Sequence, residues 1–427
     1  MGSKTLSGVS TFLLNQFQIL CNTFIINCYF SIIERIIMAI TLVLLFLFLK
    51  QFYFFPSGNI GLADISLILC FLILIRSHIR NRDLPSTLKS DILLYLFLLC
   101  VLTINSIYGI INQNKEFFKY SLFWIYNICA IWTFRELYRL FGDKFLRLFN
   151  AIVKLNIITQ FFIYLFGQGR LFHEYWGAIR YMGTFNDPNQ LAFFLFLMIL
   201  LGYLYVCTKK DRTYPVFYLL TLPVLYATKS TGILLGFISF TFFASIYYFY
   251  QITAHYRFSK KLWFILFSAI SLFTVIFLIQ IWPSDNFDVK NLDYTMISRI
   301  QEKLWKISHG GLTSLILDRG IEKLLLYPQY ILWGAGEGGF DRFTLASQIN
   351  EIHCCLLSIL FCYGIVPTCI LLKWLWKNLK CNSKAVWCAI AGLLIESFFL
   401  INYRQPLFWM ILIYPSFTKE DNKNKFY

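Results

Sequence analysis

Long apolar stretches, separated by short polar connections, recur along the whole chain. A helix that crosses a bilayer needs about 20 mostly apolar residues, and about twelve segments reach or approach that length. The segments are 36–55, 61–75, 91–111, 117–134, 145–166, 188–207, 214–227, 231–252, 262–282, 351–372, 385–401 and 407–417. Those at 61–75, 214–227 and 407–417 are short. The pattern predicts an all-α polytopic membrane protein with a single integral membrane domain over residues 1–427.

Composition excludes an ordinary soluble domain. The chain is 58% hydrophobic and only 14% charged, whereas soluble proteins carry about 25% charged residues. The net charge of +16 would suggest nucleic acid in a soluble protein, but here the basic residues lie mainly in short connections between spans. The 12 cysteines show no metal-ligand spacing and mostly lie in apolar stretches. We therefore expect membrane lipids around the chain, no nucleic acid, and neither metal nor other cofactor.

The distribution of lysine and arginine predicts the orientation. If the chain starts in the cytoplasm, eighteen basic residues lie in five short cytoplasmic connections, and four lie in the short connections on the other side. Cytoplasmic loops hold such an excess because positive residues resist translocation. Both termini are therefore predicted to be cytoplasmic. The four outer basic residues are Lys115, Lys119, Lys229 and Arg404.

Two longer connections, 167–187 and 283–350, fall on the outer side in this orientation. The second carries two amphipathic patterns, and in the first of them Glu302 precedes Lys306 by one helical turn, which favours a helix. The apolar positions are Ile297, Ile300, Leu304 and Ile307, then Leu317, Ile321, Leu324 and Leu325. We predict two helices on the outer rim, each with its apolar face against the bundle or the lipid headgroups.

The first outer loop ends in a strong helix-start signal. Asp187 precedes Pro188 and Asn189, and Gln190 follows three residues after Asp187. A carboxylate at this position accepts hydrogen bonds from free N–H groups, and proline suits the first helical position. The helix start also directs the positive end of a helix dipole toward the outer face, where an anion is stabilised.

The second outer loop closes on Asn350, Glu351 and His353, next to an apolar span. Asn350 is predicted to cap that span, which places His353 in the first helical turn. Because a helix N-terminus disfavours imidazolium, His353 is expected to be neutral and able to accept a proton. The alternative is a histidine that is only hydrogen-bonded at the membrane interface.

A glycine-rich segment in the long outer loop formally fits a dinucleotide-binding pattern. Gly334, Gly336 and Gly339 have the spacing G-x-G-x-x-G, but no strand is predicted before them and no helix start after them. The segment is therefore interpreted as a tight turn.

Acidic residues give two further candidates. Asp285, Asp288 and Asp293 match no calcium-loop spacing, so a solvated loop is favoured over a metal site. Glu396 lies inside a predicted span, where a carboxyl is either functional or hydrogen-bonded to a neighbouring helix. The sequence leaves the role of Glu396 open.

Taken in order, these features resemble the O-antigen ligase and polymerase superfamily. The resemblance covers about residues 167–372 and rests on the order, spacing and shared outer placement of several motifs. These are an arginine before a G-x-F-x-x-P-N helix start, a second arginine in a long outer loop, a glycine-rich turn, and E-x-H at the next span. In this chain they are Arg180, Gly183, Phe185, Pro188 and Asn189; Arg319; Gly334 and Gly336; and Glu351 and His353.

The resemblance implies a helical bundle of the C-type glycosyltransferase kind in the bacterial inner membrane. It also implies an undecaprenyl-diphosphate-linked oligosaccharide as substrate, and a chain-length regulator as a further candidate partner. Arg180 and Arg319 are the implied diphosphate-binding residues, and His353 is the implied catalytic residue. Asp187, Pro188, Asn189, Gly334 and Gly336 would shape the site, while Arg170, Arg299 and Arg342 have weaker claims.

The implied chemistry is physically reasonable without nucleotide or metal. A sugar on a diphosphate already has a good leaving group, and guanidinium groups match phosphate oxygens while staying charged. The acceptor hydroxyl must lose its proton as it attacks the anomeric carbon, and His353, oriented by Glu351, is the best base available. A single displacement would invert the anomeric centre.

Three functions compete. A polymerase extends another lipid-linked repeat unit, whereas a ligase transfers the glycan to the lipid A core. The sequence around Glu351, with Tyr363 and Gly364 after it, favours the polymerase. A lipid-linked oligosaccharide flippase belongs to a different class, and the scarcity of charges at the membrane midplane and the lack of an internal repeat disfavour it.

Overall fold

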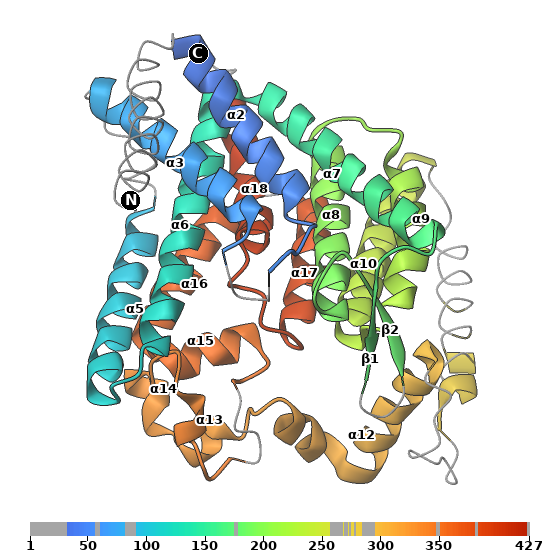
Figure 1. Ribbon diagram of the computed structural model, residues 1–427. Coiled ribbons are helices and arrows are strands. Elements are labelled where there is room, and N and C mark those ends of the chain that lie inside the picture. The colour runs from blue at the N-terminus through green and yellow to red at the C-terminus, as the bar shows by residue number, and fades with distance from the viewer. Residues whose placement is uncertain are drawn as a thin grey trace, which may run out of the picture.

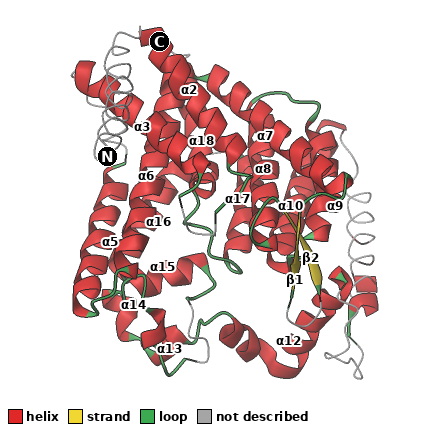
Figure 2. Ribbon diagram, in the orientation of Figure 1, coloured by secondary structure: helices red, strands yellow, loops and turns green. Residues whose placement is uncertain are grey.

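The computed structural model describes residues 32–55, 60–81, 91–174, 178–256, 295–346, 351–380 and 383–424, with isolated positions between 268 and 283. Within this part of the chain the protein is a helical bundle, and the two short strands β1 and β2 form its one hairpin (Figures 1 and 2). The predicted all-α class is therefore confirmed, apart from this hairpin in the loop 167–187.

Helices overlap the predicted spans, except that 262–282 lies largely outside the described residues, and the span 351–372 is divided into two helices. They are α2 (Ile32–Leu49), α3 (Leu62–Asn81), α5 (Ile92–Ile111), α6 (Glu116–Phe141), α7 (Asp143–Leu165), α8 (Pro188–Thr208), α9 (Tyr214–Ala227), α10 (Thr231–Tyr256), α15 (Cys355–Tyr363), α16 (Ile365–Leu379), α17 (Lys384–Ser397) and α18 (Pro406–Asn424). Of the described helices, α3, α5, α7, α8 and α10 are long and apolar enough to cross a membrane. The protein is therefore a helical membrane protein, while the full number of spans stays a prediction.

Helix α8 is the centre of the bundle. Within its span 78% of the residues are buried inside the protein, against 28% for α5 and for α10, and it packs against α7, α9, α10, α17 and α18. A helix that is apolar all round is expected to be enclosed by other helices. The exposed apolar faces of α5 and α10 are then the surfaces that meet lipid.

The segments predicted to lie outside gather at one end of the bundle. The hairpin of β1 (Arg170–His173) and β2 (Ile179–Gly183) lies there with α12 (Met296–Asp318), α13 (Lys323–Leu326) and α14 (Gln329–Trp333) (Figure 1). The first predicted amphipathic helix is present as α12, and its Glu302 pairs with Lys306 at 2.9 Å. Its place on the outer rim stays a prediction. A kink at Gly311 divides α12.

The second predicted rim helix, over Leu317 to Leu325, is wrong in its extent. Helix α12 ends at Asp318, and Gly320 takes the left-handed conformation with φ +64°. The N–H of Ile321 donates to the Ile316 carbonyl and that of Gly320 to the Leu317 carbonyl, which is the Schellman pattern that terminates helices. Helix α13 therefore begins only at Lys323, and Arg319 lies at a helix end.

The predicted span 351–372 is also corrected, because it is two helices. Helices α15 and α16 meet at Gly364, where φ is +79° and an added Cβ would lie 2.5 Å from the Leu332 carbonyl oxygen. The glycine-rich segment packs against this break: Ala335 and Gly336 donate N–H bonds to the Phe361 and Cys362 carbonyls. Gly334 and Gly336 both have positive φ, and the chain bends at 337 and 338. The tight turn itself stays a prediction.

Buried ion pairs join the opposite ends of the helices, which are predicted to be cytoplasmic. Arg135 of α6 pairs with Asp91 at 3.1 Å, and the indole of Trp374 in α16 donates to the same carboxylate at 2.7 Å. His78 of α3 contacts Glu136 of α6 at 2.8 Å. These contacts hold α3, α5, α6 and α16 together at the end away from the rim.

Candidate functional site

Arg180 lies on β2 and is 5% exposed. Its three guanidinium nitrogens each have a partner in the protein. Nε donates to the Thr228 carbonyl at 2.9 Å, Nη1 to Glu174 at 2.9 Å, and Nη2 to Asn189 Oδ1 at 2.8 Å. The side chain therefore joins the hairpin to the start of α8 and to the turn between α9 and α10.

The helix start beside Arg180 has the predicted geometry. Asp187 Oδ1 accepts the N–H bonds of Asn189 at 2.7 Å and Gln190 at 3.2 Å, with Pro188 in the first turn. The Asn189 amide oxygen also accepts a bond from the Ser230 hydroxyl at 2.8 Å. The cap is thus confirmed, and it fixes Asn189 against the arginine.

Two further cations, Lys229 and Arg299, lie near Arg180. Together with Glu174 and Arg180 they are called the Glu174 cluster below. Arg299, at the start of α12, donates to the same Glu174 oxygen at 2.7 Å. Burial and then Arg299 lower the pKa of Arg180, and burial, Arg299 and Arg180 lower the pKa of Lys229. The Asp187 carboxylate also acts on Arg180, so three cations face two carboxylates. The remaining excess of positive charge favours an anion.

The backbone of Lys229 is also unusual. Its φ is +50°, a left-handed conformation that residues with a Cβ adopt at a cost in energy. The conformation lies in the tight turn that also supplies the Thr228 carbonyl to Arg180. Backbone strain of this kind is concentrated at functional sites.

Arg319 and His353, distant in sequence, are adjacent in the structure. The His353 N–H donates to the Arg319 carbonyl at 2.9 Å. The Arg319 guanidinium lies over the Phe399 ring, 5.4 Å from its centroid, and donates to the Phe399 carbonyl. Arg319, Glu351, His353 and Arg404 are called the His353 cluster below.

His353 does not lie in a first helical turn as predicted. Helix α15 begins at Cys355 with Cys354 as its cap, and the predicted cap Asn350 lies outside the described residues. Burial lowers the pKa of His353 below its ordinary value, and Arg319, Lys323 and Arg404 lower it further against the opposing effect of Glu351. The imidazole is therefore neutral at pH 7, as expected, but the cause is different. Burial lowers its pKa, whereas the sequence predicted that a helix dipole would do so.

Glu351 is bound to an arginine that sequence reasoning used only for topology. Arg404 donates from Nη1 to Glu351 Oε1 at 3.1 Å and from Nη2 to Oε2, and its Nε donates to Glu337 at 2.8 Å. The predicted role of Glu351 in orienting His353 stays a prediction. Glu337 and Arg404 carry no local motif, because their partners are far away in the chain.

The loop between α17 and α18 connects the two clusters along the rim. Phe399 contacts Arg319, and it packs on Gly232, where an added Cβ would lie 2.9 Å from the Phe399 Cβ. Gly232 follows Ser230, which bonds to Asn189 of the first cluster. The loop also meets the start of α15, where the Cys355 thiol donates to the Leu400 carbonyl at 3.0 Å.

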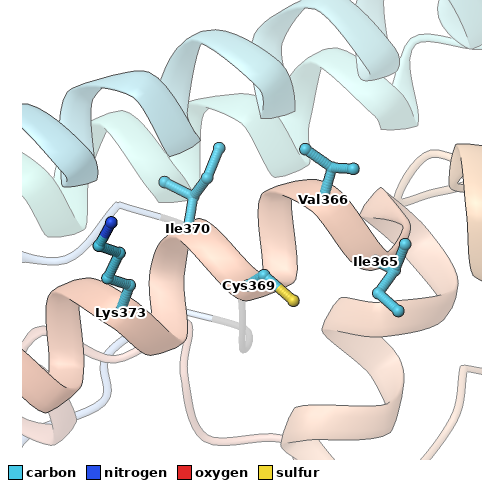
Figure 3. Close-up of a pocket in the computed structure, with 5 residues that line it drawn as sticks. All are labelled: Ile365, Val366, Cys369, Ile370 and Lys373. Atoms are coloured by element: carbon cyan, nitrogen blue, oxygen red, sulfur yellow. The ribbon is translucent and has the colours of Figure 1, made fainter.

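Two other places lack the groups that chemistry would need. An open groove runs along α16, and Figure 3 shows that all of its lining side chains come from that helix. Its residues are Ile365, Val366, Cys369, Ile370 and Lys373. The groove offers no convergent polar groups, so it suits lipid rather than chemistry. Within the described residues no cluster of three His, Cys, Asp or Glu side chains is placed to hold a metal, and Asp285, Asp288 and Asp293 lie outside them.

Glu396, left open by the sequence, is fully buried in α17. Its Oε1 accepts a hydrogen bond from the Asn402 amide at 2.5 Å, and its Cβ would lie 2.6 Å from a Cβ added at Gly236 of α10. The carboxyl thus helps to anchor the loop between α17 and α18 beneath the His353 cluster.

Comparison with protein-family models, with curated proteins and with solved structures gives no match.

Proposed function

We propose that this protein is a bacterial inner-membrane glycosyltransferase that joins undecaprenyl-diphosphate-linked repeat units at the outer face, as an O-antigen polymerase does. The observation that carries the proposal is a half-buried, neutral imidazole beside Arg319, on the same rim as a cation-rich cluster at a helix start. A neutral base and a site for an anionic leaving group are the two components that this reaction needs.

The roles of the residues follow from their surroundings. The diphosphate of the donor would lie against the Glu174 cluster, where Arg299 and Lys229 supply charge and the fully bonded Arg180 keeps the turn and the helix start in place. Arg319 would face the diphosphate from the His353 cluster. The acceptor oxygen attacks the anomeric carbon, the bond from that carbon to the diphosphate oxygen breaks, and His353 takes the hydroxyl proton.

The orientation is tested by reporter fusions. Fusions at Arg170 and Asn286 should be active only with an extracytoplasmic reporter, and fusions at Arg80 and Lys380 only with a cytoplasmic one, because of the excess of basic residues in the inner loops. A cytoplasmic result at Arg170 would contradict the proposed function, since the lipid-linked glycan is used on the outer side.

The reaction itself is tested with a deletion strain that has an intact lipid A core and O-antigen pathway. Loss of a polymerase should leave core carrying one repeat unit and no longer ladder, because a ligase still transfers single units. A bare core with long chains held on undecaprenyl diphosphate would instead identify a ligase. A bare core with unpolymerised units on the cytoplasmic side would identify a flippase and contradict the enzymatic proposal.

A further inference from the structure

Arg404 lies between two carboxylates from different segments of the outer loop. It contacts Glu337 through Nε at 2.8 Å and through Nη2 at 2.6 Å, and it holds both oxygens of Glu351. The guanidinium plane lies over the Tyr120 ring, 4.4 Å from its centroid. A bidentate pair of this kind fixes direction as well as distance.

The Glu337 side of this bridge is buried and held by several hydrogen bonds. Glu337 is 1% exposed, and its carboxylate accepts bonds from the Tyr403 hydroxyl at 2.8 Å, the Trp124 indole at 3.2 Å and the Tyr363 hydroxyl. Its backbone N–H donates to Asn105 at 2.8 Å. A buried anion with this many donors is held by α5, α6 and α15 together.

The Glu351 side of this bridge is partly exposed to solvent. The Glu351 side chain is 24% exposed, and it lies two residues from His353 in a segment without regular helix. The segment is tied down at His353 by the bond from its N–H to the Arg319 carbonyl. Glu351 therefore depends on Arg404 for its direction.

We propose that Arg404 is a positioning residue that ties Glu351 to the fixed Glu337 and so prevents Glu351 from bonding to the His353 imidazole. The carboxylate then remains near the ring as a charge, while the ring nitrogens stay open to an acceptor hydroxyl. This inference rests on the proposed function only for the identity of the group that gives up the proton.

The charged groups around His353 determine in which direction its pKa should shift when Arg404 or Glu351 is replaced. Arg319 at the end of α12, Lys323 of α13 and Arg404 lower the pKa of His353, and Glu351 raises it. Loss of Arg404 removes one positive neighbour and frees Glu351 to form a carboxylate–imidazolium pair, and both changes raise the pKa. Loss of Glu351 acts in the opposite direction.

The test follows the His353 titration directly, by NMR of the purified protein with isotope-labelled histidine, with the signal assigned from its loss in His353→Gln. Arg404→Gln should raise the pKa of His353 by about one unit, as expected for a nearby charge. Glu351→Gln should lower it, and the double variant should return close to the wild-type value. Arg404→Lys, which keeps the charge and loses the fork, should lie between wild type and Arg404→Gln.

Arg342→Gln is the matched control. Arg342 is another half-buried arginine of the rim. It contacts the rings of Tyr108 and Phe117 and donates to the Ala335 carbonyl, so its loss should not move the titration. An unchanged His353 pKa in Arg404→Gln, or the same raised value in the double variant, would overturn the inference. If the shifts appear but the protein forms no glycosidic bond, the inference stands and the proposed function fails.

Discussion

Replacing His353 by alanine should lower the rate of glycosyl transfer at least about a hundredfold, the lower end for loss of a general base. The fold should survive, because the backbone N–H that bonds to the Arg319 carbonyl is unchanged by the substitution. The rate is measured on purified protein with a lipid-linked repeat unit. The wild-type rate should fall on acidification only below about pH 6.5, since burial holds the imidazole pKa beneath its ordinary value.

His309→Ala is the matched control, because His309 stacks on Trp305 at the exposed surface of α12 and should leave the rate unchanged. A His353→Ala protein that is folded and turns over at the wild-type rate would remove His353 from the chemistry. A chelator should have no effect on the wild type. Inhibition by chelation would contradict the metal-free scheme and return Asp285, Asp288 and Asp293 as candidate ligands.

The sequence predicted those contacts that form between residues close together in the chain. The cap at Asp187 and the pair of Glu302 with Lys306 each involve residues within one helical turn, and both are present. The spans follow from apolar length, which the bilayer imposes on each segment separately. Helix ends were harder to predict: Gly320 and Gly364 each terminate a helix through a left-handed conformation inside an otherwise continuous apolar pattern.

The residues that hold the site together gave no such signal. Glu174 meets Arg299 across 125 residues, and Glu337 meets Arg404 across 67, so no spacing rule relates them. In the sequence Arg404 is one of four basic residues on the predicted outer side, and Glu337 lies among glycines that by themselves account for a bend. The predicted site residues Arg319 and His353 were placed together only by resemblance, and their contact depends on the Schellman end of α12.

Replacing Arg180 by alanine should abolish transfer and also destabilise the protein. Three hydrogen bonds would be lost, and among the described residues Glu174 would keep Arg299 as its one ionic partner. Breaking one side of a buried ion pair costs about 3–5 kcal/mol, which thermal unfolding in detergent measures. Arg180→Lys should recover part of both properties, because it keeps the charge without the fork.

The anion-binding role must then be separated from this structural one, and the other two cations of the cluster allow it. Arg299→Ala and Lys229→Asn should each raise the KM for the lipid-linked donor about tenfold, since a hydrogen bond to a charged group contributes about 1.5–3 kcal/mol. Asparagine is chosen at Lys229 because it tolerates the left-handed φ of +50° better than most residues. Lys229→Asn should unfold near the wild-type temperature. Arg299→Ala should lose less stability than Arg180→Ala, because Glu174 keeps its bond to Arg180. The KM effect should shrink at high salt. If the KM is unchanged in both variants and Arg180→Ala is inactive only because it unfolds, the Glu174 cluster has a structural role alone. Arg319 would then be the remaining candidate for binding the diphosphate.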